Sequence, residues 1–249
     1  MIIFDIGFNV GDFSRVCFEK YPDCTVVAVE ANKDLYFSNT IDNPNLHVIN
    51  NLVSDKDGEM KDFFVELNQT GISTASKDFM EKSRFRMGSK YLPPGSGRWI
   101  NAGKVSTVTL DALVKDHGAP DILKVDVEGY EYEVLLGLNE KTGKICFECH
   151  EEEKDKLDKI LKHLVDIGYT EFGLIGYFEE GDVFENLTFS DQGDPYLVEP
   201  LKYRKHQEFK KDISSCFTPE RRINYGMVWR RRFIFISKEK EILDNILEN

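Results

Sequence analysis

The sequence predicts an α/β fold with a mainly parallel, doubly wound sheet, and two observations indicate this fold class. Short apolar runs rich in β-branched residues alternate with helical patterns over the first two thirds of the chain, which is typical of βαβ units. The chain has 249 residues, of which 41% are hydrophobic, enough for one sizeable core. We therefore predict a single domain over residues 1–249, with substrate-side insertions near residues 68–104 and 177–225.

Six apolar runs predict the strands of the sheet, namely Ile2–Ile6, Thr25–Val29, Leu46–Asn50, Val105–Thr109, Ile122–Asp126 and Lys144–Glu148. Helical spacing of apolar residues predicts the helices Phe13–Lys20, Lys33–Asn39, Leu110–His117, Tyr130–Leu138 and Glu152–Ile167. Doubly wound sheets bind ligands at the carboxyl ends of their strands. Motifs at these ends are therefore the first candidates for a functional site.

Two stretches interrupt the alternation, Asn68–Lys104 and Tyr177–Tyr225. A loop of this length in a compact domain is usually functional or disordered. A late apolar run, Met227–Ile236, predicts a strand that pairs antiparallel with Tyr169–Ile175 and closes one edge of the sheet. The predicted sheet is thus mainly parallel, with an antiparallel edge strand from the C-terminal part.

The charge of the chain argues against a surface that binds nucleic acid or an anionic membrane over its whole extent. The sequence has 32 basic and 44 acidic residues, a net charge of -12. The segment Leu201–Arg232 is an exception, with ten basic and three acidic residues. An anionic ligand would explain this excess, although a solvated lysine-rich loop is the commoner cause.

The sequence predicts neither a membrane span nor a disulfide framework. No apolar run approaches the ~20 residues needed to cross a bilayer, and Met1 leads into the first apolar run without the regions of a signal peptide. The five cysteines are odd in number and scattered along the chain, which favours reduced thiols. We expect a soluble, cytoplasmic protein.

The first predicted strand ends in the turn Asp5–Gly11. Gly7 and Gly11 allow a tight turn and a close approach of a ligand to the backbone, although many α/β proteins need such a turn only to connect strand and helix. The GxxxG spacing differs from the GxGxxG that places a pyrophosphate on a helix. The carboxylate of Asp5 suits a ligand with an ammonium group, such as S-adenosylmethionine, and would repel a phosphate.

An acid, Glu30, follows the second predicted strand and is succeeded by Ala31. An acid at this place typically accepts hydrogen bonds from both ribose hydroxyls of an adenosine-bearing cofactor. Taken alone, Glu30 could equally be a solvated acid near a helix start. Together with the turn at Asp5, it favours a cofactor site.

The segment after the third predicted strand is a weaker candidate for binding adenine. Apolar side chains here, among them Val53, could enclose the ring, and Ser54 or Asp55 could meet its edge. Turn chemistry around Asp55–Gly58 would explain the same residues without any ligand.

The strongest cluster of candidate residues lies around the fifth predicted strand, where Lys124, Asp126 and Glu128 alternate. We expect this strand to be central and buried. Buried ionisable groups cost several kcal/mol unless they are paired or bind a ligand. Either each group has a structural partner, or the cluster is part of a functional site. We favour the functional site.

These motifs together resemble those of the FkbM family of methyltransferases. The resemblance covers about residues 3–150, and its most specific part is the K-x-D-x-E-G-x-E pattern of Lys124–Glu131. The other matching segments are Phe4–Gly11, Val29–Asn32, Leu110–Asp111 and Phe147–His150. The sequence after Ile175 matches no part of the family pattern.

The resemblance implies a Rossmann-like methyltransferase fold, S-adenosylmethionine as the methyl donor, and O-methylation, often of sugars, glycans or glycosylated natural products. Its implied cofactor-binding residues are Asp5, Gly7, Asn9, Gly11 and Glu30. Asp126 would lie beside the methionyl end of the cofactor. The implied acceptor is therefore carbohydrate-like.

Transfer of a methyl group to a hydroxyl requires a base near the acceptor oxygen. The candidates are His150, Glu148 and Asp126, which follow neighbouring predicted strands or end them. His150 is preferred because imidazole is mostly neutral near pH 7, although it could instead cap the helix that follows. Asp126, Glu128 and Glu148 could also hold a divalent metal ion, which we consider possible but do not favour.

Two further classes of function stay open. A methyltransferase acting on nucleic acid or protein would explain the basic segment Leu201–Arg232, but the Asn-Pro-Pro-aromatic motif of DNA amino methylation is absent. A non-catalytic, cofactor-binding subunit is the second alternative. For a sugar acceptor, Tyr91, Trp99 and Tyr177 could stack on the ring, although loop aromatics as often form small satellite cores.

Overall fold

The computed structural model describes residues 1–83, 85, 97–149, 154–169, 171–177, 201–205 and 232–236. Contacts within the chain divide it into two units, Met1–Ile145 and Cys146–Asn249, and each unit is considered by itself. The single domain expected from the sequence stays a prediction.

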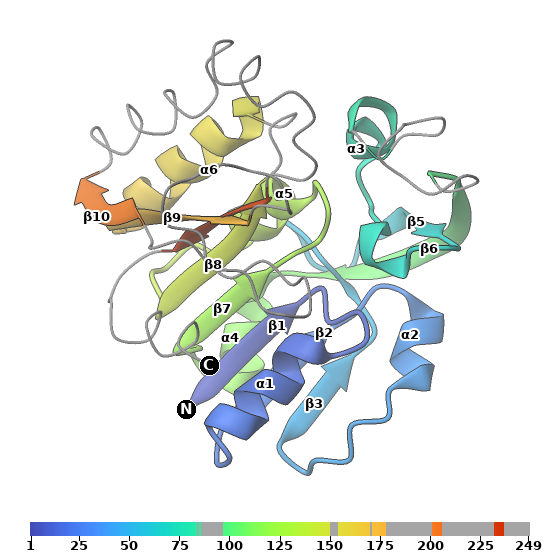
Figure 1. Ribbon diagram of the computed structural model, residues 1–249, viewed down its shortest axis with the longest axis horizontal. Coiled ribbons are helices and arrows are strands. Elements are labelled where there is room, and N and C mark those ends of the chain that lie inside the picture. Colours follow the sequence, from blue (N-terminus) through green and yellow to red (C-terminus); the bar gives the residue numbers. More distant parts are fainter. Residues whose placement is uncertain are drawn as a thin grey trace, which may run out of the picture. The chain divides into compact units, whose positions relative to one another are not determined.

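The first unit contains a parallel sheet with the strand order β7-β1-β2-β3 (Figure 1). Its strands are β1 (Ile2–Ile6), β2 (Thr25–Val29), β3 (Leu46–Ile49) and β7 (Ile122–Val125). The start of β8 (Lys144–Cys149) follows beside β7, where the amide of Lys144 donates to the carbonyl of Asp121 at 2.9 Å. The predicted α/β class with a mainly parallel sheet is confirmed.

Apolar side chains make the core of this sheet, as expected for parallel strands covered on both faces. Ile3, Phe4, Val26, Val27 and Val125 are fully buried. The helices of the sheet are α1 (Asp12–Lys20), α2 (Lys33–Ser38), α4 (Leu110–His117) and α5 (Glu131–Leu136). In Figure 1, α1 lies in front of the sheet and α4 behind it. The strands and helices predicted here are confirmed, with small shifts at their ends.

The predicted strand Val105–Thr109 does not join the parallel sheet. It is the end of a longer strand, β6 (Trp99–Val108), which pairs antiparallel with β5 (Met60–Glu66) and parallel with β4 (Leu52–Val53) in a separate sheet. Its placement in the doubly wound sheet is therefore wrong. Apolar alternation indicates that a strand exists, but it does not indicate which sheet the strand joins.

Regular elements occupy both ends of the stretch Asn68–Lys104. A short 3-10 helix, η1 (Thr70–Ile72), is followed by helix α3 (Lys77–Lys82). The hydroxyl of Ser76 caps α3 by accepting from the amide of Phe79 at 3.1 Å. The structure therefore gives part of this predicted insertion a defined fold.

Trp99 packs in a small satellite core within this region. Ile72, Phe79 and Phe85 are buried together, and Trp99 packs against them. The indole Nε1 of Trp99 donates to the carbonyl of Ile72 at 2.8 Å. Of the two interpretations of Trp99, the structure favours the satellite core over stacking on a sugar. Tyr91 and the side chain of Tyr177 lie outside the described residues.

The second unit contains antiparallel strands in the order β10-β9-β11-β8. Apart from β8, its elements are α6 (Lys154–Asp166), β9 (Glu171–Tyr177), β10 (Leu201–Lys205) and β11 (Arg232–Ile236). The predicted antiparallel pairing is confirmed, because Ile234 on β11 is in register with Ile175 on β9. However, β11 also pairs with β8, so it lies between two strands. The outer position beside β9 belongs to β10, which the sequence did not predict.

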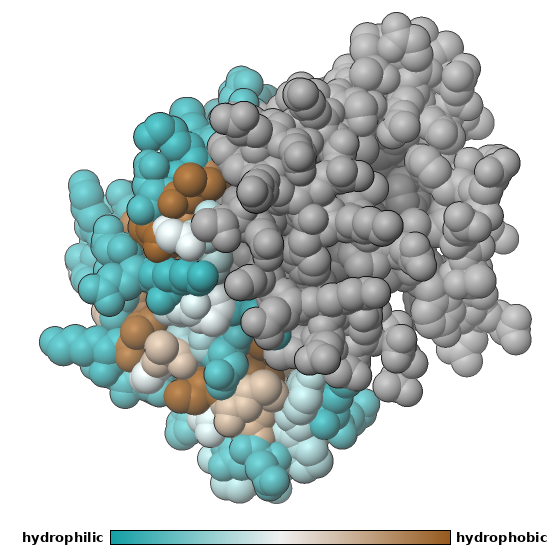
Figure 2. All heavy atoms as spheres, turned by 90° about the vertical axis from the view of Figure 1, so that its left-hand side faces the viewer, coloured by the Kyte–Doolittle hydropathy of each residue, from teal (hydrophilic) through white to brown (hydrophobic). Residues whose placement is uncertain are grey.

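Hydrophilic side chains dominate the described residues on the face shown in Figure 2, and hydrophobic ones form only small, separate groups there. No helix among the described residues is long and apolar enough to cross a membrane. Cys17, Cys24 and Cys146 are free thiols, in agreement with the expectation for them. Burial raises the pKa of Cys17 to about 12, which disfavours the thiolate form that acts as a nucleophile.

Candidate cofactor-binding site

The loop between β1 and α1 approaches the loop after β7 closely, and Gly7 makes this approach possible. Gly7 has a positive φ of 82°, and a Cβ atom here would lie 1.9 Å from the carbonyl oxygen of Asp126. The amides of Gly7 and Phe8 donate to the carbonyl of Val29 at 3.0 and 3.2 Å, which ties the loop to the end of β2. Only glycine fits this position without displacing the second loop.

Asp5 lies beneath this loop and is fully buried. Its Oδ2 accepts from the Ser14 hydroxyl at 2.7 Å, and its Oδ1 accepts from Lys124 Nζ at 3.1 Å. Lys124 also donates to the carbonyl of Gly7 at 2.8 Å. The structure thus places Asp5 as a support of the loop, and its predicted role in cofactor binding stays a prediction. The same pair explains the partly buried Lys124 without any ligand.

Glu30 follows β2, and its carboxylate bridges two neighbouring loops. Oε2 accepts from the amide of Asn9 at 2.7 Å, and Oε1 accepts from the amide of Asn32 at 2.6 Å. Only 6% of the residue is exposed. Burial raises the pKa of Glu30 above its usual value, and the two amide hydrogen bonds oppose this rise. The carboxylate is therefore held in one orientation before any ligand binds.

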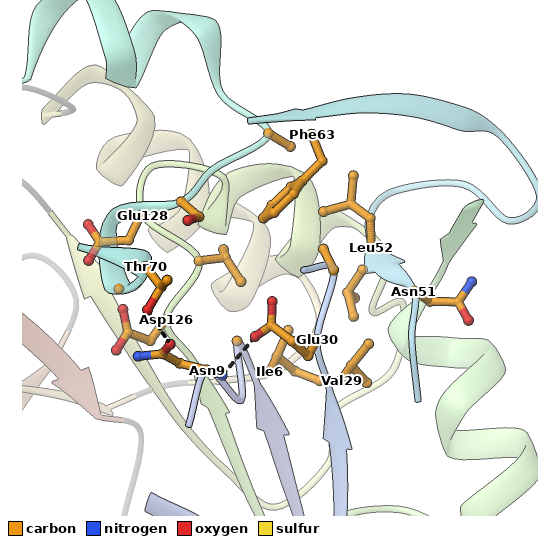
Figure 3. Close-up of a pocket in the computed structure, with 17 residues that line it drawn as sticks. Ile6, Asn9, Val29, Glu30, Asn51, Leu52, Phe63, Thr70, Asp126 and Glu128 are labelled. Atoms are coloured by element: carbon orange, nitrogen blue, oxygen red, sulfur yellow. Dashed lines mark hydrogen bonds between the residues drawn. The ribbon is translucent and has the colours of Figure 1, made fainter. Parts of the chain in front are cut away.

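A pocket in the first unit lies around Glu30 (Figure 3). It encloses roughly 490 Å³ of space, part of it open to solvent. In Figure 3, one end presents the apolar side chains of Leu52 and Phe63, and the other end presents Asp126 and Glu128, with Glu30 between them. The pocket therefore offers an apolar end, a central acceptor and an acidic end.

The acidic end is built on the loop that follows β7. The strand ends at Val125, so Asp126 and Glu128 are loop residues and not strand residues as predicted. The amide of Asp126 donates to the carbonyl of Ile6 at 3.0 Å. Glu131, at the start of α5, accepts from the amides of Val127 and Gly129 at 3.1 and 3.3 Å. The last acid of the K-x-D-x-E-G-x-E pattern thus folds the loop, while Asp126 and Glu128 line the pocket.

The sequence model of the protein family described as 'Methyltransferase FkbM domain' matches residues 5–171 of this chain. The match covers more than half of the chain. The chain belongs to the FkbM methyltransferase family. This membership confirms the resemblance found in the sequence. The functional class is therefore that of a methyltransferase, and membership implies use of S-adenosylmethionine.

Two solved structures resemble this FkbM-family chain at low sequence identity. Precorrin-6y C5,15-methyltransferase from Geobacter metallireducens GS-15 is 11% identical, with a TM-score of 0.39, and the match covers 96% of this chain and 80% of that one. A protein from Thermoplasma acidophilum described as a candidate methyltransferase is 10% identical, with a TM-score of 0.41 and coverages of 96% and 69%. A search of curated proteins found no significant match.

Most of the predicted cofactor-binding residues of this FkbM-family chain meet at the pocket. The structure brings together Gly7, Asn9, Glu30, Ala31, Val53 and Asp126. Gly11 lies apart, with a positive φ of 85° at the start of α1. Ser54 is fully buried, and its hydroxyl lies 3.1 Å from both Asp55 Oδ1 and the Tyr130 hydroxyl. Gly11, Ser54 and Asp5 therefore shape the site from outside the lining.

The predicted catalytic and metal-binding residues are divided between the two units of the chain. Asp126 and Glu128 lie in the first unit, and Glu148 is on β8 in the second. His150 lies outside the described residues. The general-base roles of these residues and the possible metal site at Asp126, Glu128 and Glu148 stay predictions.

The sequence motifs do not predict several of the residues that line the pocket of this FkbM-family chain. Phe63 comes from β5, and the segment around η1 supplies Thr70, Gly71, Ser73 and Ala75. The hydroxyl of Thr70 donates to Asn9 Oδ1 at 3.2 Å. The turn around Gly58 followed by the apolar run in β5 was a usable strand signal. No local pattern, however, links residues 70–75 to a loop some 60 positions earlier.

Proposed function

We propose that this chain is an S-adenosylmethionine-dependent O-methyltransferase that acts on a hydroxyl of a sugar, glycan or glycosylated small molecule. The observation that carries the proposal is the carboxylate of Glu30, held by the amides of Asn9 and Asn32 between an apolar end and an acidic end of one pocket. This order of groups fits the three parts of S-adenosylmethionine.

The apolar end suits the adenine ring. Leu52, Val53 and Phe63 are almost fully buried and line this end together with Ile6 and Val29. Such a wall encloses a flat ring through dispersion and the removal of apolar surface from water. Glu30, next to this wall, would accept hydrogen bonds from the ribose hydroxyls.

The acidic end suits the methionyl group, whose ammonium is positively charged. Asp126 and Glu128 line this end, whereas Asp5 lies outside the lining, below the loop. Lys124 Nζ lies 3.1 Å from Asp5 Oδ1 and 3.9 Å from Asp126 Oδ2, so Asp5 is its nearer partner. Opposite charges attract strongly in a partly enclosed site. Of the two acids predicted for this end, we favour Asp126, because it lines the pocket.

S-adenosylmethionine supplies an electrophilic methyl group on a sulfonium. The chain must hold an acceptor hydroxyl in line with that group and remove its proton. Asp126 is the base candidate that lies in the described pocket, and His150 and Glu148 are the others. The carbohydrate-like acceptor is proposed because the FkbM resemblance implies O-methylation of sugars and glycans.

Calorimetric titration of the full chain with S-adenosylhomocysteine and, in parallel, with NAD tests the cofactor. We expect binding of S-adenosylhomocysteine in the micromolar range and none of NAD. Binding of NAD alone, or of neither ligand, would overturn the proposed function.

For the acceptor, the test is transfer of a radiolabelled methyl group to a panel of sugars, nucleic acids and proteins. We expect a sugar to be labelled as an alkali-stable ether. Labelling of nucleic acid or protein alone would favour the alternative class.

The pH dependence of cofactor binding provides a test of Glu30. Ribose hydroxyls stabilise the ionised carboxylate, so binding lowers the pKa of Glu30 from its raised value in the free protein. Affinity for S-adenosylhomocysteine should therefore be constant above that raised pKa and fall as the pH decreases through it. Titrations between pH 4.5 and 8 should show this fall for the native chain and a flatter profile for Glu30→Gln; equal slopes would contradict the assignment.

A further inference from the structure

Thr74 is a fully buried residue between η1 and α3. Its backbone is fixed to the small sheet, because its amide and carbonyl both exchange hydrogen bonds of 2.9 Å with Phe64 on β5. The position of its side chain is therefore determined by β5. That side chain contacts the loop after β7.

The hydroxyl of Thr74 makes two hydrogen bonds. It donates to the carbonyl of Glu128 at 2.7 Å and accepts from the amide of Ser76 at 2.8 Å. Glu128 is 54 positions away in the sequence and belongs to the loop after β7. The hydroxyl thus connects the small sheet to the acidic end of the pocket, and a valine of the same shape could form neither bond.

The backbone of Glu128 needs such an anchor. Its φ is 53°. This left-handed conformation is energetically unfavourable for residues other than glycine. Gly129 follows with a φ of 86°, and a Cβ there would lie 2.7 Å from the ring of Phe79. Glu131 holds the amides of Val127 and Gly129, and Thr74 holds the carbonyl of Glu128 between them.

We propose that Thr74 is a positioning residue, which keeps Glu128 in the left-handed conformation so that its carboxylate contacts the methionyl end of the cofactor. The inference rests on the proposed function, because the ligand is S-adenosylmethionine. Glu128 lines the pocket beside Asp126, at the end opposite Leu52 and Phe63 (Figure 3). Loss of the Thr74 hydroxyl should therefore affect the methionyl part of the ligand and leave the adenosine part unaffected.

Two ligands separate these parts. S-adenosylhomocysteine carries both adenosine and the amino-acid group, whereas 5′-methylthioadenosine carries the adenosine without the amino-acid group. We would titrate both into the native chain, Thr74→Val, Thr74→Ser and Thr107→Val. Thr107 is a matched control: it is also buried, its hydroxyl accepts from the amide of Glu59 at 2.9 Å, and it lies on β6 outside the pocket lining.

Thr74→Val should weaken the binding of S-adenosylhomocysteine about tenfold. This is the usual effect of losing one buried hydrogen bond to a positioned group. Binding of 5′-methylthioadenosine should change less than about twofold. Thr74→Ser retains the hydroxyl and should bind both ligands like the native chain, and Thr107→Val should do the same. Glu128→Gln should reproduce the selective loss, and it serves as the test if Thr74→Val does not fold.

Equal weakening of both ligands in Thr74→Val would indicate a general structural role and overturn the inference. An unchanged affinity for S-adenosylhomocysteine in Thr74→Val or Glu128→Gln would also overturn it, while the proposed function would stand. If the native chain bound neither adenosine ligand, the proposed function and the inference would both fail.

Discussion

Replacement of Glu30 by alanine is expected to weaken the binding of S-adenosylhomocysteine by about 100-fold or more. The substitution removes the carboxylate that would accept hydrogen bonds from both ribose hydroxyls. A hydrogen bond to a charged group contributes roughly 1.5–3 kcal/mol. The variant also removes the acceptor of the amides of Asn9 and Asn32, so the loop after β1 loses its fixed position. Calorimetric titration at pH 7.5 measures the effect directly.

Asp57→Ala is the control for this loss of a backbone acceptor. The carboxylate of Asp57 accepts from the amide and the hydroxyl of Thr109 at 2.6 and 3.1 Å, and it lies outside the pocket lining. Its removal should leave the affinity within about twofold of the native value. If Glu30→Ala bound the ligand as tightly as Asp57→Ala does, Glu30 would have no role in holding the cofactor.

Gly7→Ala is expected to be the most destabilising single substitution in the loop after β1. The added Cβ would lie 1.9 Å from the carbonyl oxygen of Asp126, at a residue with a φ of 82°. Relief of this clash requires the loops after β1 and β7 to separate. Overpacking combined with an unfavourable φ costs about 3 kcal/mol or more. Denaturant unfolding should show this loss, and binding of S-adenosylhomocysteine should fall by at least about tenfold.

Gly58→Ala separates the cost of the backbone conformation from the cost of the clash. Gly58 has a φ of 72°, similar to that of Gly7, and a Cβ atom there meets nothing within 4 Å. Its substitution should lower the free energy of unfolding by only about 1 kcal/mol and leave ligand binding unchanged. A similar loss of stability in both variants would mean that the approach of the two loops is not constrained by Gly7.

The parallel sheet could be predicted because its strands are continuous apolar runs. Strands β1 and β2 are buried on both faces, and their side chains fill the core almost without polar interruption. The small sheet could not be assigned in the same way. The exposed and half-buried residues of β6 alternate poorly, and its pairing with β5 across the segment 67–98 is a long-range property.

The candidate site was predictable to the extent that it depends on the ends of β1 and β2. Gly7 is recognisable because a close approach of two loops requires glycine, and Glu30 is recognisable as the acid that follows β2, where it lines the pocket. The role of Asp5 was not predictable, since its partners Ser14 and Lys124 are 9 and 119 positions away. Which acid lines the pocket and which supports the loop is decided by packing.

The ion pair of Asp5 and Lys124 has a consequence for the thermodynamics of binding. Lys124 holds the carbonyl of Gly7, and Glu30 holds the amide of Asn9, so the loop after β1 is already ordered in the free protein. A ligand that enters the pocket does not have to freeze this loop, and little conformational entropy is lost on binding. Affinity at this site is therefore set by the fit of the ligand to a rigid frame.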